Sequence, residues 1–245
     1  MTRRLWIADR VAEGRAYLTG DNAAHLARVL RARKGQQFDI AVEGVTRIGT
    51  ILSISGDQVE FELGPATEEH SLPEVNVVIS IYKFDRLEWA VEKLTELGVA
   101  RIFPVIARRT EPHLAKAAEK RAERWRRIAH EASQQSRRPT PPEIAAPVAL
   151  AGMIQSTTGS RIVLSELEEL VPLKSALAQC PPPVTLALGP EGGWTPEEAD
   201  EFRNSGWKAA SLGSTILRAE TAAIAAVAVV MAEISGQHSA VSIQP

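Results

Sequence analysis

Apolar and polar residues alternate over short distances in the first part of the chain. Three segments with this pattern, residues 36–42, 45–53 and 58–63, are separated by short polar turns that contain glycine. Closely spaced runs of this kind predict β-strands joined by tight turns. A helical stretch at residues 22–31 precedes them. We therefore predict a small β-rich domain over residues 1–70, followed by a short linker.

From residue 73 onward, strand-like and helix-like patterns alternate. The segments that read as buried strands are residues 75–82, 101–107, 161–164, 184–188 and 208–212. Helical patterns lie between them, at residues 85–97 and 114–135 and after the later strands. Alternation of this kind is typical of a mainly parallel sheet covered by helices on both faces. The predicted fold class is therefore α/β, with this domain extending over residues 73–245.

A run with scarcely any polar residue lies near the end of the chain, at residues 221–235. It is shorter than the roughly 20 apolar residues that span a bilayer, so it reads as a helix buried on most sides. Its many alanines permit close approach of another helix, either in the protein's own core or in a second subunit. Residues 235–245 have little to bury and are predicted to form a loose tail.

The strand at residues 184–188 leads directly into the loop Gly189-Pro190-Glu191-Gly192-Gly193. The helix after this loop has a well-marked start, because Thr195 suits the N-cap, Pro196 the first helical position and Glu198 the end of a capping box. Open α/β sheets bind nucleotide-like ligands at such loops, since backbone N–H groups without a Cβ beside them can approach a ligand closely. The sequence therefore predicts a ligand site at this junction.

The composition of this loop restricts the ligand that it can hold. The loop has neither the G-K-[ST] of a phosphate-binding loop nor the G-x-G-x-x-G spacing of a dinucleotide fold. Glu191 places a carboxylate where a phosphate would lie, which favours a ligand without phosphates and with positive charge. S-adenosylmethionine, with a sulfonium and an ammonium, meets both conditions. The alternative is that the glycines only form turns and that Glu191 faces water.

A second strand-to-helix junction lies at residues 211–223, SLGSTILRAETAA. Its glycine loop includes two apolar residues, Ile216 and Leu217, and leads into the buried helix. Arg218 and Glu220 stand at the mouth of that helix, where burial would penalise their charges unless they are paired or used. This second loop therefore strengthens the prediction of a ligand site.

The two junctions, LGPEGG and LG-x-x-IL-R-x-ET-A, strongly resemble those of the RsmE family. These are bacterial methyltransferases of the SPOUT (trefoil-knot) superfamily that methylate N3 of one uridine in 16S ribosomal RNA. Three further segments resemble the family in the same order, HLARVLR at residues 25–31, KFDRLEWAVEKLTELGV at 83–99 and ERWRRIAHEASQQS at 123–136. The resemblance implies that the β-rich domain is a PUA-like β-barrel and that the α/β domain is a SPOUT methyltransferase domain with a deep trefoil knot.

The resemblance also implies that both glycine loops bind the cofactor S-adenosylmethionine. The residues expected to contact it are Leu188, Gly189, Pro190, Glu191, Gly192 and Gly193 in the first loop and Leu212, Gly213, Ser214, Ile216, Leu217 and Arg218 in the second. Thr215 of the second loop stands where the family often has a basic or amide residue.

Methylation of uracil N3 requires removal of a weakly acidic proton and stabilisation of the anion that develops on the flanking carbonyl oxygens. Arg218 is the candidate catalytic residue for this stabilisation, because its guanidinium is permanently charged and offers a planar fork of donors. Glu220 is the second candidate, either as a base or by orienting Arg218. The alternative role of Arg218 is a salt bridge to Glu220 or Glu191 that holds the loops.

Positive charge is concentrated in two blocks, although the net charge of the chain is only −2. Residues 1–47 contain nine Lys and Arg against five Asp and Glu, and residues 108–138 contain ten against four. Segregated charge is expected if RNA lies across particular surfaces, whereas a solvated basic face is the more common explanation for any one block taken alone.

Specific basic residues are predicted to contact RNA phosphates, which would fix the register of the RNA without reading its bases. In the small domain, Arg28 and Arg31 lie one turn apart on the predicted helix and Arg33 follows it. Lys83 and Arg86, at the end of the first α/β strand, are predicted to do the same near the active site.

The whole-chain composition agrees with a globular intracellular enzyme. The chain has 245 residues and is 44% hydrophobic, enough for one or two domains with a full core. The single Cys180 excludes an internal disulfide, and the first residues lack an apolar signal region, so a cytoplasmic location is expected. The five histidines show no metal-ligand spacing with one another or with Cys180, and we predict no metal.

The predicted function is S-adenosylmethionine-dependent methylation of N3 of a specific uridine in 16S ribosomal RNA. The assembled small ribosomal subunit is the expected substrate. A homodimer is expected, because SPOUT enzymes bind their cofactor near a dimer interface. Two alternatives are a SPOUT methyltransferase that acts on another RNA, such as tRNA or large-subunit RNA, and a noncatalytic RNA-binding factor in ribosome assembly.

Overall fold

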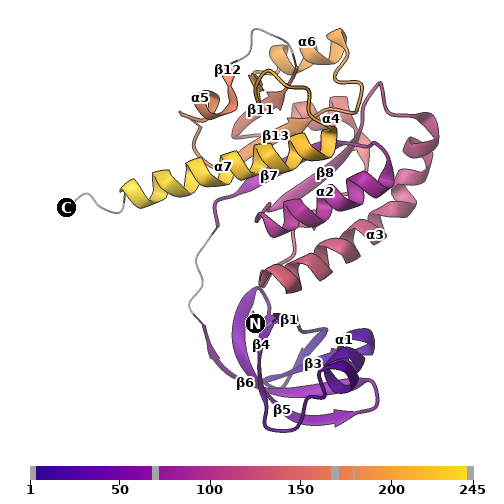
Figure 1. The fold of residues 1–245 in the computed structure, drawn as a ribbon, viewed down its shortest axis with the longest axis vertical. Coiled ribbons are helices and arrows are strands. Elements are labelled where there is room, and N and C mark those ends of the chain that lie inside the picture. Colours follow the sequence, from indigo (N-terminus) through magenta and orange to yellow (C-terminus); the bar gives the residue numbers. More distant parts are fainter. Residues whose placement is uncertain (1–3, 68–71, 167–170, 179, 242–245) are drawn as a thin grey trace. The chain divides into compact units, whose positions relative to one another are not determined.

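The chain folds into two units, shown in Figure 1. The computed structural model describes residues 4–67, 72–166, 171–178 and 180–241. The N-terminal unit comprises residues 1–71 and 131–141, and the C-terminal unit comprises residues 72–130 and 142–245. The sequence did not predict that the later segment 131–141 belongs to the first unit.

Two polar contacts tie the later segment into the N-terminal unit. The backbone N–H of Leu5 donates to the carbonyl oxygen of Gln134 over 3.1 Å. The guanidinium of Arg137 lies 2.8 Å from the carboxylate of Asp39. Both contacts join residues more than 90 positions apart in the chain, which is why local sequence patterns do not indicate them.

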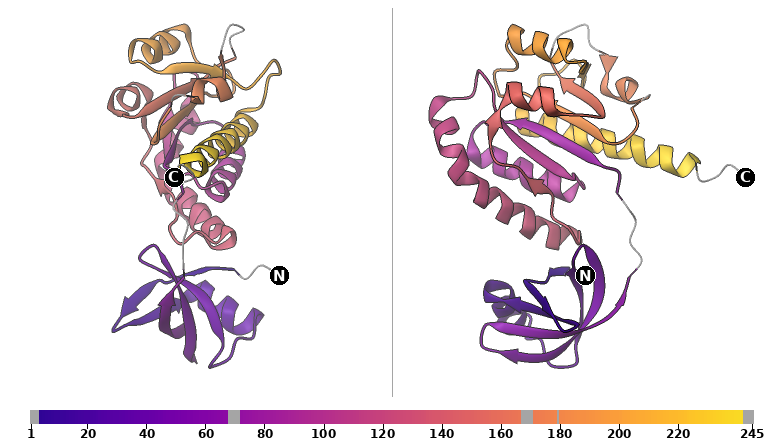
Figure 2. Two further views of the ribbon diagram at one scale, coloured as in Figure 1. Left: turned by 90° about the vertical axis from the view of Figure 1, so that its left-hand side faces the viewer. Right: turned by 180° about the vertical axis from the view of Figure 1, so that it is seen from behind.

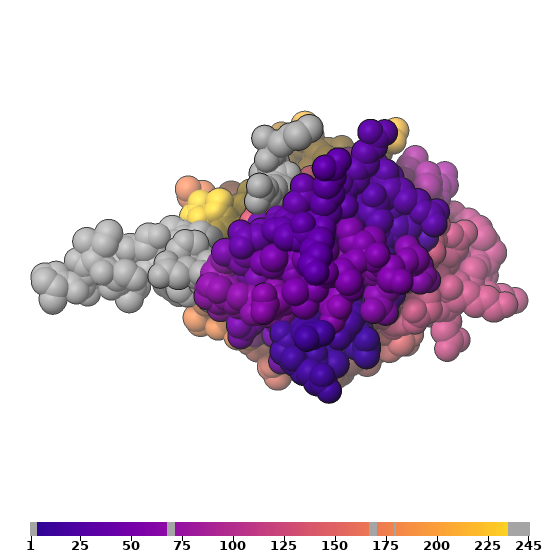
Figure 3. All heavy atoms as spheres, turned by 90° about the horizontal axis from the view of Figure 1, so that it is seen from below, coloured from indigo at the N-terminus to yellow at the C-terminus, as the bar shows by residue number. Residues whose placement is uncertain are grey.

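The N-terminal unit is built on one six-stranded sheet. Figure 3 shows one face of this unit in indigo to purple. Its strands are β1 (Trp6–Ile7), β2 (Arg10–Ala12), β3 (Arg15–Thr19), β4 (Gln37–Val42), β5 (Val45–Ser55) and β6 (Gln58–Ala66). They lie in the order β1-β4-β5-β6-β3-β2, and all neighbours pair antiparallel except β1 with β4. Strands β4 to β6 confirm the three predicted strands. Strands β1 to β3 were not predicted, because runs of two to five residues are too short to show a clear alternation.

The predicted helix at residues 22–31 is only partly present. Helix α1 (Gly20–Ala24) passes into a wider π-helical turn, η1 (His25–Val29), which buries Leu26 in the core of the unit. The chain then leaves the helix at Arg31, whose φ of +52° is the left-handed conformation common after a helix end. Arg28 and Arg31 are therefore not one turn apart on a regular helix.

The C-terminal unit contains an eight-stranded sheet in which all described neighbours pair in parallel. Its strands are β7 (Val75–Ser80), β8 (Arg101–Ile106), β9 (Glu143–Ile144), β10 (Val148–Ala149), β11 (Ser160–Leu164), β12 (Val171–Pro172), β13 (Val184–Leu188) and β14 (Lys208–Ser211). The order is β10-β8-β7-β13-β11-β14-β12, with β9 also paired to β8. This arrangement confirms the predicted α/β fold with a mainly parallel sheet, while the trefoil knot stays a prediction.

Helices cover both faces of this sheet, as the views of Figure 2 show. The helices are α2 (Phe84–Glu96), α3 (Pro112–Ser136), α4 (Leu150–Ser156), α5 (Leu173–Leu177), α6 (Pro196–Asn204) and α7 (Ala219–Val241). Along β7, Val77 and Ile79 join the core that includes Trp125 of α3, whereas Val78 joins the core that includes Phe202 of α6. The continuous apolar run of β7 thus reflects burial on both faces.

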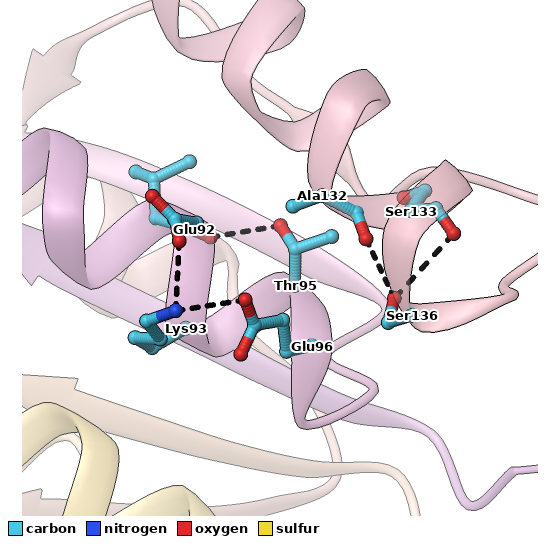
Figure 4. Close-up of polar contacts among 8 residues, drawn as sticks. Glu92, Lys93, Thr95, Glu96, Ala132, Ser133 and Ser136 are labelled. Carbon is cyan, nitrogen blue, oxygen red and sulfur yellow. Dashed lines mark hydrogen bonds and ion pairs between the residues drawn. The ribbon is translucent and has the colours of Figure 1, made fainter. Parts of the chain in front are cut away.

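The end of α2 shows how these helices are stabilised locally (Figure 4). The ammonium of Lys93 lies 2.7 Å from the carboxylate of Glu92 and 2.8 Å from that of Glu96. The hydroxyl of Thr95 donates to the backbone carbonyl one turn earlier. Gly98, with φ of +96°, then ends the helix as its position in the sequence predicted.

Helix α7 continues to Val241, so the prediction of a loose tail is wrong for residues 235–241. Residues 242–245 lie outside the described part of the chain. Residues 219–244 contain no proline, and the single Gly236 costs a helix only about 1 kcal/mol, so a helix that has already formed continues. None of the helices described is both long enough and apolar enough to cross a membrane.

Candidate active site

The carboxyl ends of the parallel strands surround a cavity of about 1030 Å³ in the C-terminal unit. Its walls include the loops after β13 and β14, residues 164–166 after β11, and Arg109 after β8. Strand β13 lies at the centre of the sheet, next to β7. The chain continues from β7 toward one edge of the sheet, to β8, and from β13 toward the other edge, to β14. Open α/β sheets characteristically bind ligands outside the carboxyl ends of their strands at such a point.

Both predicted glycine loops contribute to this single cavity. Every residue predicted to bind the cofactor lines it, namely Leu188, Gly189, Pro190, Glu191, Gly192, Gly193, Leu212, Gly213, Ser214, Ile216, Leu217 and Arg218. The structure therefore brings together two loops that are separated in the sequence by helix α6 and strand β14.

The first loop needs glycine for two different reasons. A Cβ added at Gly189 would lie 3.3 Å from the ring of Trp194, and Gly193 has φ of +69°, which side chains rarely adopt. The indole N–H of Trp194 donates to the carbonyl oxygen of Leu164 over 3.0 Å, so the ring joins the first loop to the end of β11. The sequence analysis did not single out Trp194, although it directly follows the glycines.

The predicted capping box is confirmed, and α6 begins at Pro196 as expected. The backbone N–H of Thr195 donates to one oxygen of Glu198 over 2.8 Å, and the N–H of Glu198 donates to the hydroxyl of Thr195 over 3.3 Å. The second carboxylate oxygen of Glu198 accepts from the backbone N–H of Arg108 over 2.7 Å. This buried carboxylate therefore fastens the first loop to the segment after β8.

Arg109 is a wall residue that the sequence analysis missed. Its guanidinium donates to the carbonyl oxygen of Gly192. This hydrogen bond is a second link, after that of Glu198, between the β8–α3 segment and the first loop. Its position shortly after β8 could have indicated that it lies at the site, because the carboxyl ends of parallel strands meet at the same edge of a sheet.

The second loop is more open than the first. Gly213 has φ of +127°, and the side chain of Ile216 is 82% exposed. Arg218 is exposed on the cavity wall, directly before α7. The alternative of a salt bridge from Arg218 to Glu191 or Glu220 is not observed, because the ion pairs that these carboxylates form within the described residues go to Arg86.

Arg86 forms part of the cavity wall, and its predicted contact with RNA stays a prediction. Its guanidinium pairs closely with Glu191, and its Nε lies 3.9 Å from the carboxylate of Glu220. Glu220 itself is buried in the first turn of α7 and does not line the cavity. Nearby, burial and then the negative charges of Glu220 and Glu191 raise the pKa of Tyr82, so its hydroxyl keeps its proton.

The remaining predicted RNA contacts lie on exposed surfaces. Arg28, Arg31 and Arg33 are exposed on the N-terminal unit, and Lys83 is exposed just before α2 in the C-terminal unit. Across the described residues, no three His, Cys, Asp or Glu side chains gather in a way that could hold a metal ion. The absence of a metal stays a prediction.

Two family models match this chain. One described as an RNA methyltransferase domain matches residues 68–231, and one described as an RNA methyltransferase PUA domain matches residues 18–64. The parallel α/β unit with its cavity and the separate curled sheet therefore correspond to an RNA methyltransferase with a PUA domain.

A curated relative specifies the family further. The ribosomal RNA small subunit methyltransferase E of Synechocystis is 32% identical over 237 residues, which cover 93% of this chain and 77% of that protein. The chain belongs to the ribosomal RNA small subunit methyltransferase E family, and the resemblance found in its motifs is confirmed.

Solved structures share the fold over nearly the whole chain. A ribosomal RNA small subunit methyltransferase E from Neisseria gonorrhoeae, bound to S-adenosylmethionine, has a TM-score of 0.84 at 24% identity and covers 94% of this chain and 97% of that chain. A protein from Legionella pneumophila, solved in complex with the same cofactor, has a TM-score of 0.80 at 27% identity, with coverage of 94% and 96%.

Replacing Glu198 by Ala should lower the free energy of unfolding of the C-terminal unit by about 3 kcal/mol, because two backbone N–H groups lose a charged acceptor. The neighbouring Glu197→Ala is the matched control, since Glu197 is exposed and its loss should cost at most about 1 kcal/mol. Urea denaturation of both variants provides the comparison. Equal stability of the two variants would show that the buried carboxylate does not fasten the loops.

Proposed function

We propose that this protein transfers a methyl group from S-adenosylmethionine to N3 of one uridine in 16S ribosomal RNA. The observation that carries the proposal is the convergence of both glycine loops on one cavity at the carboxyl edge of the sheet. The name of the Synechocystis relative and the S-adenosylmethionine bound to the two structural neighbours support it. The cytoplasm is the proposed location.

The residues present fit this cofactor. The cavity of about 1030 Å³ is large enough for a nucleoside with an amino-acid chain. Leu188, Leu212 and Leu217 offer apolar contacts, and the glycines allow backbone groups to approach closely. Glu191 supplies negative charge toward a cationic ligand. S-adenosylmethionine, when bound, supplies a methyl group activated by its sulfonium.

Arg218 is the proposed catalytic residue. It lies on the cavity wall, is exposed, and forms no ion pair with the residues that the structure describes, so its donors are available to a substrate. A guanidinium fits the developing negative charge on the uracil carbonyl oxygens. Glu220, buried and away from the cavity surface, fits a positioning role through Arg86 better than the role of a base.

A mapped methyl-transfer assay tests the proposed reaction and target. Small ribosomal subunits from a strain without the endogenous enzyme are incubated with the protein and labelled S-adenosylmethionine, and the modified nucleoside is identified by mass spectrometry. We expect 3-methyluridine at one site, and Arg218→Ala should lower the rate at least a hundredfold while cofactor binding persists. Arg101→Ala, which breaks an exposed pair with Glu74, is the control and should retain full activity.

The other outcomes of this assay distinguish the alternatives. Methylation of tRNA or large-subunit RNA instead would establish a different target for the same chemistry. Cofactor binding without transfer to any RNA would favour a noncatalytic RNA-binding factor. Full activity of Arg218→Ala would remove the catalytic assignment of this residue.

The exposed arginines of the N-terminal unit are proposed to contact RNA phosphates. Replacing both Arg28 and Arg31 by Gln should weaken RNA binding and reduce the slope of log affinity against log salt concentration by about 1.5, since each phosphate contact contributes about 0.7–0.9. Replacing Arg10 and Arg15 by Gln is the control, because Arg10 stacks on a tyrosine ring and Arg15 pairs with Glu60. An unchanged slope for Arg28 and Arg31 would reject the phosphate contacts.

The protein is proposed to act as a homodimer through α7. From residue 222 to 232 this helix has no polar residue, yet Thr221, Ala228 and Ala232 are exposed along it, with spacing that puts them on one face. Sedimentation at micromolar concentration should give twice the chain mass of 26.6 kDa, and Ala228→Arg should convert the protein to the monomer. A monomeric unmodified protein would contradict this proposal.

A further inference from the structure

Arg86 lies between two carboxylates that belong to different parts of the site. Its guanidinium pairs closely with Glu191 of the first loop, and its Nε lies 3.9 Å from the carboxylate of Glu220 at the start of α7. Arg86 also lines the cavity. One cation therefore serves two anions, one on the first loop and one at the start of α7.

The two carboxylates differ in what they need from Arg86. The side chain of Glu191 is 36% exposed and has water available, whereas that of Glu220 is only 6% exposed. One oxygen of Glu220 is buried without a hydrogen-bond partner in the described structure. A buried carboxylate without close partners is costly, so Glu220 should attract Arg86 whenever Glu191 is neutralised by something else.

The surroundings of Glu220 favour such an exchange. The hydroxyl of Tyr82 is also buried without a hydrogen-bond partner within the described residues, and its raised pKa keeps the side chain neutral, so it adds no second negative charge beside Glu220. A charge-assisted hydrogen bond requires a separation of about 2.8 Å, so Arg86 needs to approach Glu220 by only about 1 Å. The planar guanidinium has enough donors to change partners by a small rotation.

We propose that Arg86 is a positioning residue that holds Glu191 in the free cavity and transfers to Glu220 when a cationic ligand takes over Glu191. The inference rests on the proposed function, since the cationic ligand is S-adenosylmethionine. The contact between Arg86 and Glu220 is completed only when the ligand carries positive charge. When a neutral nucleoside binds, Arg86 stays paired with Glu191, and Glu220 does not contribute to the affinity.

A binding titration with two probes tests the exchange. The probes are S-adenosylmethionine and 5′-methylthioadenosine, a neutral nucleoside thioether, with isothermal titration calorimetry as the readout. Glu220→Gln should weaken binding of S-adenosylmethionine roughly tenfold, a loss of about 1.4 kcal/mol, because Arg86 then stays on Glu191. Binding of 5′-methylthioadenosine should be unchanged.

The double variant Arg86→Gln/Glu220→Gln separates positioning from a merely structural role. With the competing cation removed, affinity for S-adenosylmethionine should return at least to that of the unmodified protein. Lys93→Gln is the matched control, because it breaks ion pairs with Glu92 and Glu96 on the same helix and should change neither affinity.

Several results would overturn the inference. One such result is an unchanged affinity of Glu220→Gln for S-adenosylmethionine. Others are equal weakening of binding for both probes and failure of the double variant to recover its affinity. If Glu220→Gln does not fold, Glu191→Gln provides the test, since it should abolish the preference for the cationic probe; a retained preference contradicts the exchange. No binding of S-adenosylmethionine to the unmodified protein would overturn the proposed cofactor as well, and the first titration alone reveals it.

Discussion

Parallel pairing of the strands in the C-terminal unit is the constraint on which the site depends. Strands β7, β8, β11, β13 and β14 all run in the same direction, so the segments that follow them emerge at one edge of the sheet. The two glycine loops, Arg109 and the end of β11 therefore meet although they are far apart in the chain. A cavity at this edge follows from the topology, and the loop residues determine what it can bind.

Buried or partly buried carboxylates hold this edge together. Glu198 accepts from two backbone N–H groups and joins the first loop to the segment after β8. Glu191 and Glu220 share Arg86, which joins the same loop to α2 and α7. Three glutamates thus perform different tasks, and only Glu191 lines the cavity directly. Of the three, Glu191 is therefore the one that can face the cationic methyl donor proposed for this family member.

Local sequence signals predicted the features that depend on neighbouring residues. The capping box at Thr195 predicted that α6 begins at Pro196, as it does, and the apolar run at residues 184–188 predicted β13 with its observed bounds. All twelve residues of the two predicted loops line the cavity, since their glycines follow the ends of parallel strands. The sequence therefore placed both loops at the cavity, while the contacts of their residues with a cofactor stay a prediction.

Features that depend on distant contacts were not predictable in the same way. The pair between Arg86 and Glu191 joins residues 105 positions apart, and no local pattern distinguishes Arg86 from a surface arginine. The π-helical turn η1 ends at Val29, and Arg31 lies outside its predicted helix. A sequence pattern does not distinguish a π-helical turn from an α-helix. Helix α7 continues to Val241. The sequence analysis expected it to end near residue 235 because few apolar residues follow, but a helix that has already formed can continue without them.

The most direct measurement is a crystal structure of the protein with S-adenosylmethionine. We expect the cofactor in the cavity, between the loop that contains Glu191 and the loop that contains Arg218. A cofactor bound elsewhere on the protein, or a cavity that stays empty at saturating cofactor, would contradict the assignment of this edge of the sheet as the methyl-transfer site.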